Sequence, residues 1–210
     1  MAKNYAVARK DNMKVFQSFL CELGRRFDCY FTVESVGATG SLNNTILDSM
    51  IYVDNESLQN IDSAMEFFNN YVVVWKDAGK TNEIRLITEK KEHNKTIIML
   101  RDERLLTTTD YALTNAISLE YDGSPAGLLN LLSRQNDLIR PQTVFSIGMG
   151  NIKIDTQTHI GINATNESIR NILTDCIPLS EYSRVIWSSY TDGKEKSPVV
   201  TVKFHGNANK

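Results

Sequence analysis

Apolar and polar positions follow the same order of patterns twice along the 210-residue chain. In the second half, Ile117–Tyr121 alternates like a half-buried strand. Ser124 and Pro125 then provide a typical N-cap and first helical position. The helix that follows has an apolar face made of Leu128, Leu129, Leu131 and Leu132. With the later patterns, which end near Phe204, this half predicts the order strand-helix-strand-strand-helix-strand-strand.

The first half predicts the same order. We expect its first strand at Tyr5–Ala8 and its first helix at Asn12–Arg26, where apolar residues recur at helical spacing. A second helix is expected from Asn55 to about Asn69, followed by a closing hairpin over Val72–Ile87.

A repeated motif supports an internal duplication. Asn55–Ile61 recurs as Asn166–Ile172 with five of seven residues identical, and Trp75 and Trp187 keep nearly the same separation. We therefore predict an α+β protein of two tandem small domains, residues 1–89 and 116–206, each with two helices packed against small mixed sheets. The connecting segment, residues 90–115, contains an apolar run and is expected to pack on one of the domains.

The repeated motif is interpreted as a structural signal rather than a functional site. Asn55 and Asn166 are predicted to cap helices, because an Asn side chain accepts hydrogen bonds from the first free N–H groups. Glu56 and Glu167 are placed in the first helical turn, where a negative charge is favourable. The two tryptophans are predicted to be core residues.

Charge and composition argue against several classes of function. The chain has 23 basic and 25 acidic residues, a net charge of −2 and no polybasic tract, which argues against a nucleic-acid partner. Its longest apolar run, Tyr71–Trp75, is far below the roughly 20 residues that span a bilayer. Cys21 and Cys29 could form a bridge, although the sequence favours buried free thiols.

Enzyme motifs are incomplete in this sequence. Gly79–Thr81 is similar to the end of a phosphate-binding loop, but Val74 occupies the position of the required glycine. His93, His159 and His205 show neither metal-ligand spacing nor a nucleophile motif. We therefore predict no catalytic residues, no cofactor and no metal site.

The predicted order of elements resembles a known family. A helix beginning with Ser124–Leu132, another beginning with Asn166–Leu173 and a hairpin containing Ile186–Tyr190 are similar to the short N-terminal domain of secretins and TonB-dependent receptors, here in two tandem copies. The resemblance implies a non-enzymatic protein-protein interaction and assembly module of a bacterial cell-envelope machine, such as a secretion or pilus system. The alternatives are a periplasmic signal-relay domain of a receptor system, and a phage or cytoplasmic structural protein with a similar fold.

The location follows from the N-terminus, since Met1–Tyr5 lacks the pattern of a secretory signal. We expect a periplasmic or outer-membrane-associated protein if a leader has been removed, and a cytoplasmic one otherwise.

Protein partners are expected to add a strand to an exposed sheet edge, and an oligomer within a larger assembly is compatible with this. The candidate edges are the closing hairpins, Val72–Ile87 and Arg184–Phe204. Aromatic residues that occur in one half only are the candidate partner-binding residues: Tyr30, Phe31, Tyr121, Tyr182 and Tyr190.

Overall fold

In the computed structural model the second half has the predicted order of elements, whereas the first half begins with a strand at Met13–Val15, inside the range predicted as its first helix, which starts only at Phe16. The structure describes residues 13–36, 46–52, 58–70, 72–77, 80–92, 95–108, 111–134, 146–147, 159–176, 183–191 and 200–205. The first half contains β1 (Met13–Val15), α1 (Phe16–Phe27), β2 (Cys29–Val36), β3 (Met50–Tyr52), α2 (Ile61–Asn70), β4 (Val72–Asp77) and β5 (Lys80–Glu92). The second half contains β7 (Ala116–Gly123), α3 (Pro125–Arg134), β8 (Ser146–Ile147), β9 (Ile160–Ser168), α5 (Ile169–Cys176), β10 (Val185–Thr191) and β11 (Val200–Phe204). The α+β class is confirmed.

One seven-stranded sheet joins the two halves, in the order β4-β5-β6-β2-β10-β11-β8. The join is the parallel pairing of β2 with β10, in which Phe31 lies opposite Val185 and Val36 opposite Thr191. The division into two tandem domains is therefore not confirmed, because strands of both halves complete the same sheet. Sequence periodicity reports only local structure, so it could not reveal a pairing between distant strands.

The predicted connecting segment supplies a strand near the middle of this sheet. β6 (Thr96–Asp102) pairs antiparallel with β5 and parallel with β2. Short 3₁₀ turns follow it at Glu103–Leu106 and Ala112–Thr114, and another lies in the first half at Ile46–Asp48. The segment was expected to pack on one of the domains, and its strand β6 instead lies inside the shared sheet, between β5 and β2.

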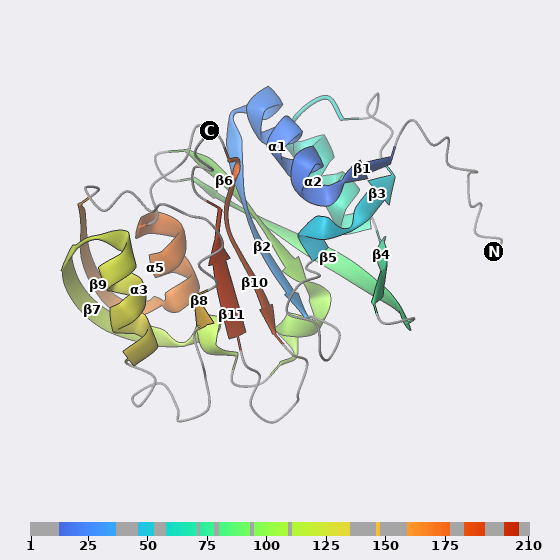
Figure 1. The fold of residues 1–210 in the computed structure, drawn as a ribbon. Helices are drawn as coiled ribbons and strands as arrows, with labels where there is room; N and C mark the ends of the chain where they lie inside the picture. The colour runs from blue at the N-terminus through green and yellow to red at the C-terminus, as the bar shows by residue number, and fades with distance from the viewer. Residues whose placement is uncertain are drawn as a thin grey trace.

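Each face of the shared strands covers a separate hydrophobic core. Alternate residues of a strand point to opposite faces, so a strand buried on both sides is apolar at nearly every position. On β2, Phe31 and Val33 pack into the core beneath α1 and α2, whereas Tyr30 packs into the core beneath α3 and α5. Figure 1 shows the two pairs of helices on opposite sides of the strands.

The first helix lies close to the second half of the chain. Its apolar face, Phe16, Phe19, Leu20 and Leu23, is buried as predicted. A side chain at Gly24 would collide with Arg184, which directly precedes β10, so glycine permits this close approach. Cys21 and Cys29 are both free thiols.

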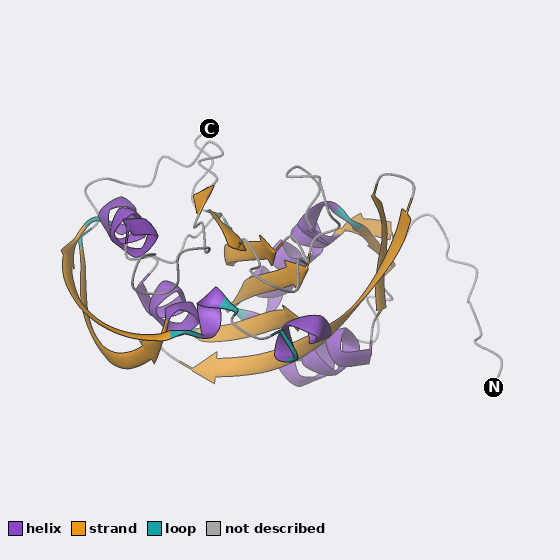
Figure 2. Ribbon diagram, turned by 90° about the horizontal axis from the view of Figure 1, so that it is seen from below, coloured by secondary structure: helices purple, strands orange, loops and turns teal. Residues whose placement is uncertain are grey.

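Two separate two-stranded ribbons also repeat between the halves. β1 pairs antiparallel with β3, and β7 pairs antiparallel with β9. Viewed from below in Figure 2, the curved β7–β9 ribbon lies at the left end of the molecule and the β4–β5 ribbon at the right end.

Helix starts are where the sequence predictions differ most from the structure. Ser124 caps α3 as expected, because its Oγ accepts a hydrogen bond from Gly127 N at 3.1 Å. The prediction for Asn166 was wrong: it lies in β9 with φ of 51°, and α5 begins only at Ile169. Asn166 forms a β-bulge, because Thr165 and Asn166 of β9 together lie opposite the single residue Ser118 of β7. An Asn residue tolerates the left-handed backbone conformation that this bulge requires.

The neighbouring Glu167 was also misplaced. It lies opposite Ile117 in the β7–β9 pairing and therefore belongs to the strand rather than to a first helical turn. In the first half, Asn60 caps α2 instead of the predicted Asn55, and its Oδ1 accepts from Ser63 N at 2.8 Å. Asn55 and Glu56, like the predicted strand Tyr5–Ala8, lie outside the described residues. The apolar positions of the motif are buried or partly buried as expected: Leu58, Ile61, Ile169 and Ile172.

The shared sheet predicts that the two halves unfold together. Separating β2 from β10 would expose apolar surface on both sides, so neither half keeps a complete core alone. Calorimetry of the full chain should give one transition with equal calorimetric and van't Hoff enthalpies. Two resolved transitions would instead support independent domains.

Candidate functional site

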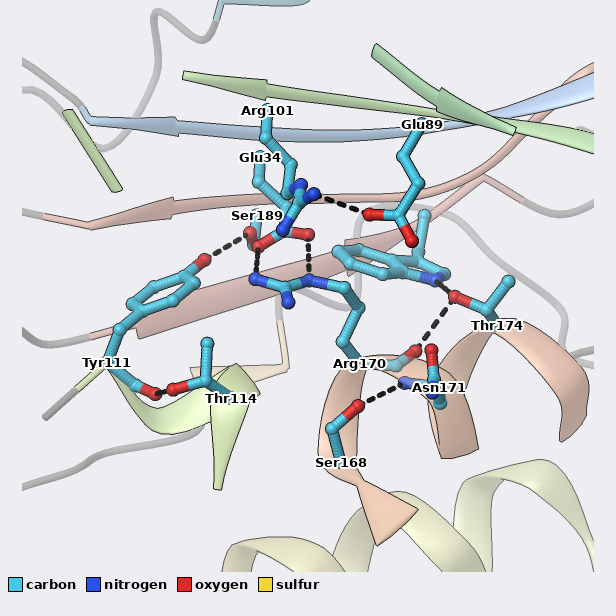
Figure 3. A network of polar contacts seen from close by, with 11 residues as sticks. Glu34, Glu89, Arg101, Tyr111, Thr114, Ser168, Arg170, Asn171, Thr174 and Ser189 are labelled. Carbon is cyan, nitrogen blue, oxygen red and sulfur yellow. Dashed lines mark hydrogen bonds and ion pairs between the residues drawn. The ribbon is translucent and has the colours of Figure 1, made fainter. Parts of the chain in front are cut away.

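A buried ion pair connects the two halves of the chain across the shared sheet. Glu34 on β2 is 0% exposed and Arg170 in the first turn of α5 is 9% exposed. The guanidinium donates two hydrogen bonds to the carboxylate, from Nε to Oε1 and from Nη2 to Oε2 at 2.9 Å (Figure 3). Removing two charges from water is costly, and this forked geometry offsets the cost by satisfying both carboxylate oxygens.

Further groups surround this pair. The Arg170 guanidinium lies 5.9 Å from the centroid of the Tyr111 ring, and Tyr111 Oη lies 3.1 Å from Ser189 Oγ. Burial raises the pKa of Tyr111 well above its ordinary value, with the charge of Glu34 acting in the same direction. Tyr111 therefore stays neutral and can take part in hydrogen bonds without adding a charge.

Charges of alternating sign extend the pair along the sheet. Arg101 on β6 lies beside Glu34 in the strand register, and its Nη2 lies 2.5 Å from Glu89 Oε2 on β5. Burial acts to lower the pKa of Arg170, but its hydrogen bonds to Glu34 and the negative charges of Glu34 and Glu89 together raise the pKa above the ordinary value. Glu89, Arg101, Glu34 and Arg170 together are called the ionic row below, and their formal charges cancel.

The helix that carries Arg170 is held by two more polar contacts. Lys91 Nζ on β5 lies 2.7 Å from Asp175 Oδ2, and Trp187 Nε1 on β10 donates to Thr174 Oγ1 at 3.3 Å. The Thr174 hydroxyl in turn donates to Arg170 O at 2.8 Å. These contacts fix the position of α5 on the shared sheet, so the ionic row and its neighbours act as a structural clamp between the halves.

A serine and a histidine meet on the other face of β10. Ser188 Oγ lies 2.8 Å from His205 Nε2, and Gln17 Nε2 lies 3.4 Å from His205 Nδ1. This order of contacts is similar to that of an activated nucleophile. Ser188 is only 3% exposed within the paired strand β10, and a substrate could not approach its hydroxyl in this conformation. The contact therefore ties α1 to β10 and to the end of β11.

The predicted partner-binding residues are scattered. Tyr30 and Phe31 are 6% and 0% exposed and belong to the two cores, so neither ring is available at the surface in this conformation. Tyr121 is half-buried, and its hydroxyl donates to Ser124 O at 2.7 Å. Tyr190 is half-buried on β10, and Tyr182 lies outside the described residues. The structure does not bring these five residues together, and their role in binding stays a prediction.

Cofactor and metal chemistry can be tested only within the described ranges. There, no group of three His, Cys, Asp or Glu residues is arranged to hold a metal ion. Burial raises the pKa of the Cys29 thiol from 9.0 to about 11, so it carries its proton at neutral pH. No helix of the described segments is long and apolar enough to cross a membrane.

The seven-stranded sheet ends at β4 on one side and at β8 on the other. Within the described part of the chain, β4 pairs on one side only, with β5. β5 reaches β6 only from Leu86 onward, so the stretch Lys80–Arg85 and β4 form a ribbon beyond the main sheet. The sequence of β4 begins Val72–Trp75, with neither charge nor proline in that run.

The β7–β9 ribbon at the other end of the molecule is different. It is interrupted by the bulge at Asn166 and presents the exposed charges Glu120 and Asp122. Bulges and charges are features that block unwanted strand pairing, and the run Val72–Trp75 lacks a charge.

An apolar pair lies close to the open edge. Val15 on β1 and Met50 on β3 are cross-strand neighbours and are 39% and 46% exposed. β3 in turn lies against β4. The open edge and the exposed pair are together called the β4 corner, and this corner is the candidate interaction site.

The sequence contained partial signals for these residues. Within the repeated motif, Gln59 is replaced by Arg170, which is the one change that introduces a charge. Glu34 is the single charged residue of β2. The β4 hairpin was among the predicted edges, but the exposed pair was not recognised because nothing in the local sequence places β1 beside β3.

Breaking the ion pair from one side should destabilise the fold. Glu34→Gln would leave the Arg170 charge buried without its counter-charge, at a cost of about 3–5 kcal/mol in the free energy of unfolding. Replacing both residues, as Glu34→Met with Arg170→Met, should cost less than either single change because no charge remains buried. Urea unfolding measures both effects.

The matched control is Glu120→Gln on the exposed face of β7, which should shift stability by no more than about 0.5 kcal/mol. Equal losses for Glu34→Gln and Glu120→Gln would contradict the clamp.

The burial of Ser188 predicts that it does not react as a nucleophile. A fluorophosphonate probe should leave the protein mass unchanged under conditions that fully label a known serine hydrolase. Labelling that disappears in Ser188→Ala would contradict this prediction and would indicate an enzyme.

Comparisons with family models, with curated proteins and with solved structures found no match to this chain.

Proposed function

We propose that this chain is a non-enzymatic protein-interaction and assembly module that binds its partner at the β4 corner. The observation that carries the proposal is the edge strand β4, which pairs on one side only within the described residues. A partner strand placed there would satisfy the outward N–H and C=O groups of β4 by main-chain hydrogen bonds.

The composition of the strand favours binding over simple exposure to water. Valine and tryptophan are among the residues that stabilise strand pairs most, through contacts between opposite side chains. Val15 and Met50 beside it add apolar surface that a partner can cover.

The cellular location and the assembly proposed for this interaction rest on the sequence resemblance alone. A secretin or TonB short N-terminal domain acts by docking, which agrees with a module whose contacts lie at a sheet edge. We therefore infer a role in a bacterial cell-envelope machine, such as a secretion or pilus system, on the periplasmic side of the assembly.

Site-specific photo-crosslinking in the native cells would test the proposal. A photoreactive phenylalanine derivative is placed at Met50 on β3, which is 46% exposed, and in a matched variant at Ser118 on the exposed face of β7. We expect protein crosslinks from position 50 and none from position 118, because only the first lies at the β4 corner.

Mass spectrometry identifies the crosslinked chains. Crosslinks from position 118 with none from position 50 would overturn the β4 corner as the binding site. Thermal unfolding of both variants checks that the introduced residue has not changed the fold.

A further inference from the structure

We propose that the end of the molecule where α1 stops and three parallel strands begin docks an acidic segment of a partner protein. Three cations at this end, Arg26, Lys95 and Arg184, lie beside the carboxylate of Asp28, and the four residues are called the basic end below. Val15 of the β4 corner precedes α1 and the basic end follows it, and a helix of 12 residues is roughly 18 Å long. The inference therefore concerns a second contact, beyond the proposed function.

The direction of the strands brings these charges together from distant parts of the sequence. Lys95 directly precedes β6 and Arg184 directly precedes β10, and both strands run parallel to β2, which begins just after Asp28. Parallel strands begin at the same edge of a sheet, so the residues that precede them meet there. Figure 1 shows α1 ending beside the beginning of β2, which adds Arg26 of its last turn.

Asp28 shows how the basic end holds a carboxylate. Lys95 Nζ lies 2.7 Å from Asp28 Oδ2, and Arg184 Nη1 lies 3.0 Å from Asp28 Oδ1. The hydrogen bonds from Lys95 and Arg184 lower the pKa of Asp28, so its carboxyl group is ionised at neutral pH. A carboxylate of another chain would meet the same two donors, because a lysine carries three N–H groups and an arginine five.

Aromatic rings hold two guanidinium groups of the basic end in place. The Arg184 guanidinium lies 4.7 Å from the centroid of the Tyr30 ring, and the Arg26 guanidinium lies 5.1 Å from that of Phe27. Gly24 makes room for Arg184, since a Cβ atom at this glycine would lie 2.4 Å from Arg184 Cβ. Side chains that are already positioned lose less conformational entropy when a partner binds.

The charge of the basic end defines the chemistry of the partner. Within the described residues it sets three cations against one carboxylate, a formal excess of two positive charges, in a chain whose net charge is −2. The acids nearest in sequence do not remove this excess, because Glu22 pairs with Lys14 and Glu92 pairs with Lys90. A segment with several carboxylates supplies the complementary charge.

Other polyanions fit the basic end less well. Single-stranded nucleic acids stack their bases on aromatic rings, but Tyr30 is buried beneath a guanidinium and Phe27 is half-buried. A membrane surface requires apolar side chains beside the cations. The exposed large apolar residues of the described ranges lie elsewhere, with Val15 and Met50 on the β1–β3 ribbon and Leu106 beyond the other end of β6. Protein carboxylates are therefore the favoured ligand.

Fluorescence anisotropy of the full chain with a fluorescein-labelled hexaglutamate peptide tests the proposal. The wild type should bind this peptide in low salt and should not bind a hexaglutamine peptide. Raising the salt to about 0.15 M, where the screening length is roughly 8 Å, should weaken the binding. Arg26→Gln and Lys95→Gln should each weaken it by roughly two- to fivefold, the range expected for one exposed ion pair.

Asp28→Asn should bind the peptide more tightly by a similar factor, because it removes the internal carboxylate that competes for Lys95 and Arg184. The residue has φ of 48°, and Asn tolerates this left-handed conformation. The matched controls change the same charges elsewhere, Arg85→Gln on β5 and Asp122→Asn on β7, both at exposed positions. Both should bind like the wild type, and thermal unfolding checks that every variant is folded.

Three results would each overturn the basic end as a carboxylate-binding surface. These are a wild type that does not bind hexaglutamate, equal losses for Lys95→Gln and Arg85→Gln, and an Asp28→Asn variant that binds no more tightly than Asp122→Asn. Tighter binding of a labelled hexathymidine oligonucleotide than of hexaglutamate would also overturn it, in favour of phosphate. Crosslinks from position 50 without any binding of hexaglutamate would refute the basic end alone and would leave the proposed function standing.

Discussion

The parallel pairing of β2 with β10 is the constraint on which the rest of the structure depends. It brings strands from opposite ends of the chain into one sheet and gives each face of that sheet a separate core. The helices of the first half cover one face and those of the second half cover the other. A duplicated order of elements has thus become a single cooperative structure, because each repeat provides part of the surface that the other must bury.

Polar groups between α5 and the shared sheet fix the relative position of the two halves as well as stabilising their contact. An entirely apolar contact between sheet and helix would tolerate small shifts of α5, whereas the fork between Glu34 and Arg170 accepts only a narrow range of positions. The ion pair of Lys91 with Asp175 and the hydrogen bond from Trp187 to Thr174 hold the same helix at two further points. The hydrophobic cores therefore supply most of the driving force, and the ionic row determines the register in which the halves meet.

Local features were predictable from the sequence, and long-range ones were not. The apolar face of α1, the Ser124 cap and the burial of Trp187 follow from spacing and side-chain chemistry alone. The start of α5 was predicted too early, because the bulge at Asn166 depends on a partner strand about fifty residues away in sequence. The β4 hairpin was recognisable as an edge candidate from its composition, whereas the ion pair joins residues whose proximity only the complete fold defines.

Glu34, the single charged residue of β2, also affects the chain while it is still being synthesised. During synthesis, β2 and β6 are complete long before β10 exists, so the growing chain holds an apolar strand without its final neighbour. Glu34 lies within that strand, and a charged side chain in an apolar strand opposes association with other nascent chains. Once α5 is made, Arg170 donates its two hydrogen bonds to the same carboxylate, and a charge that disfavours strand association in the incomplete chain becomes a contact between the halves of the finished one.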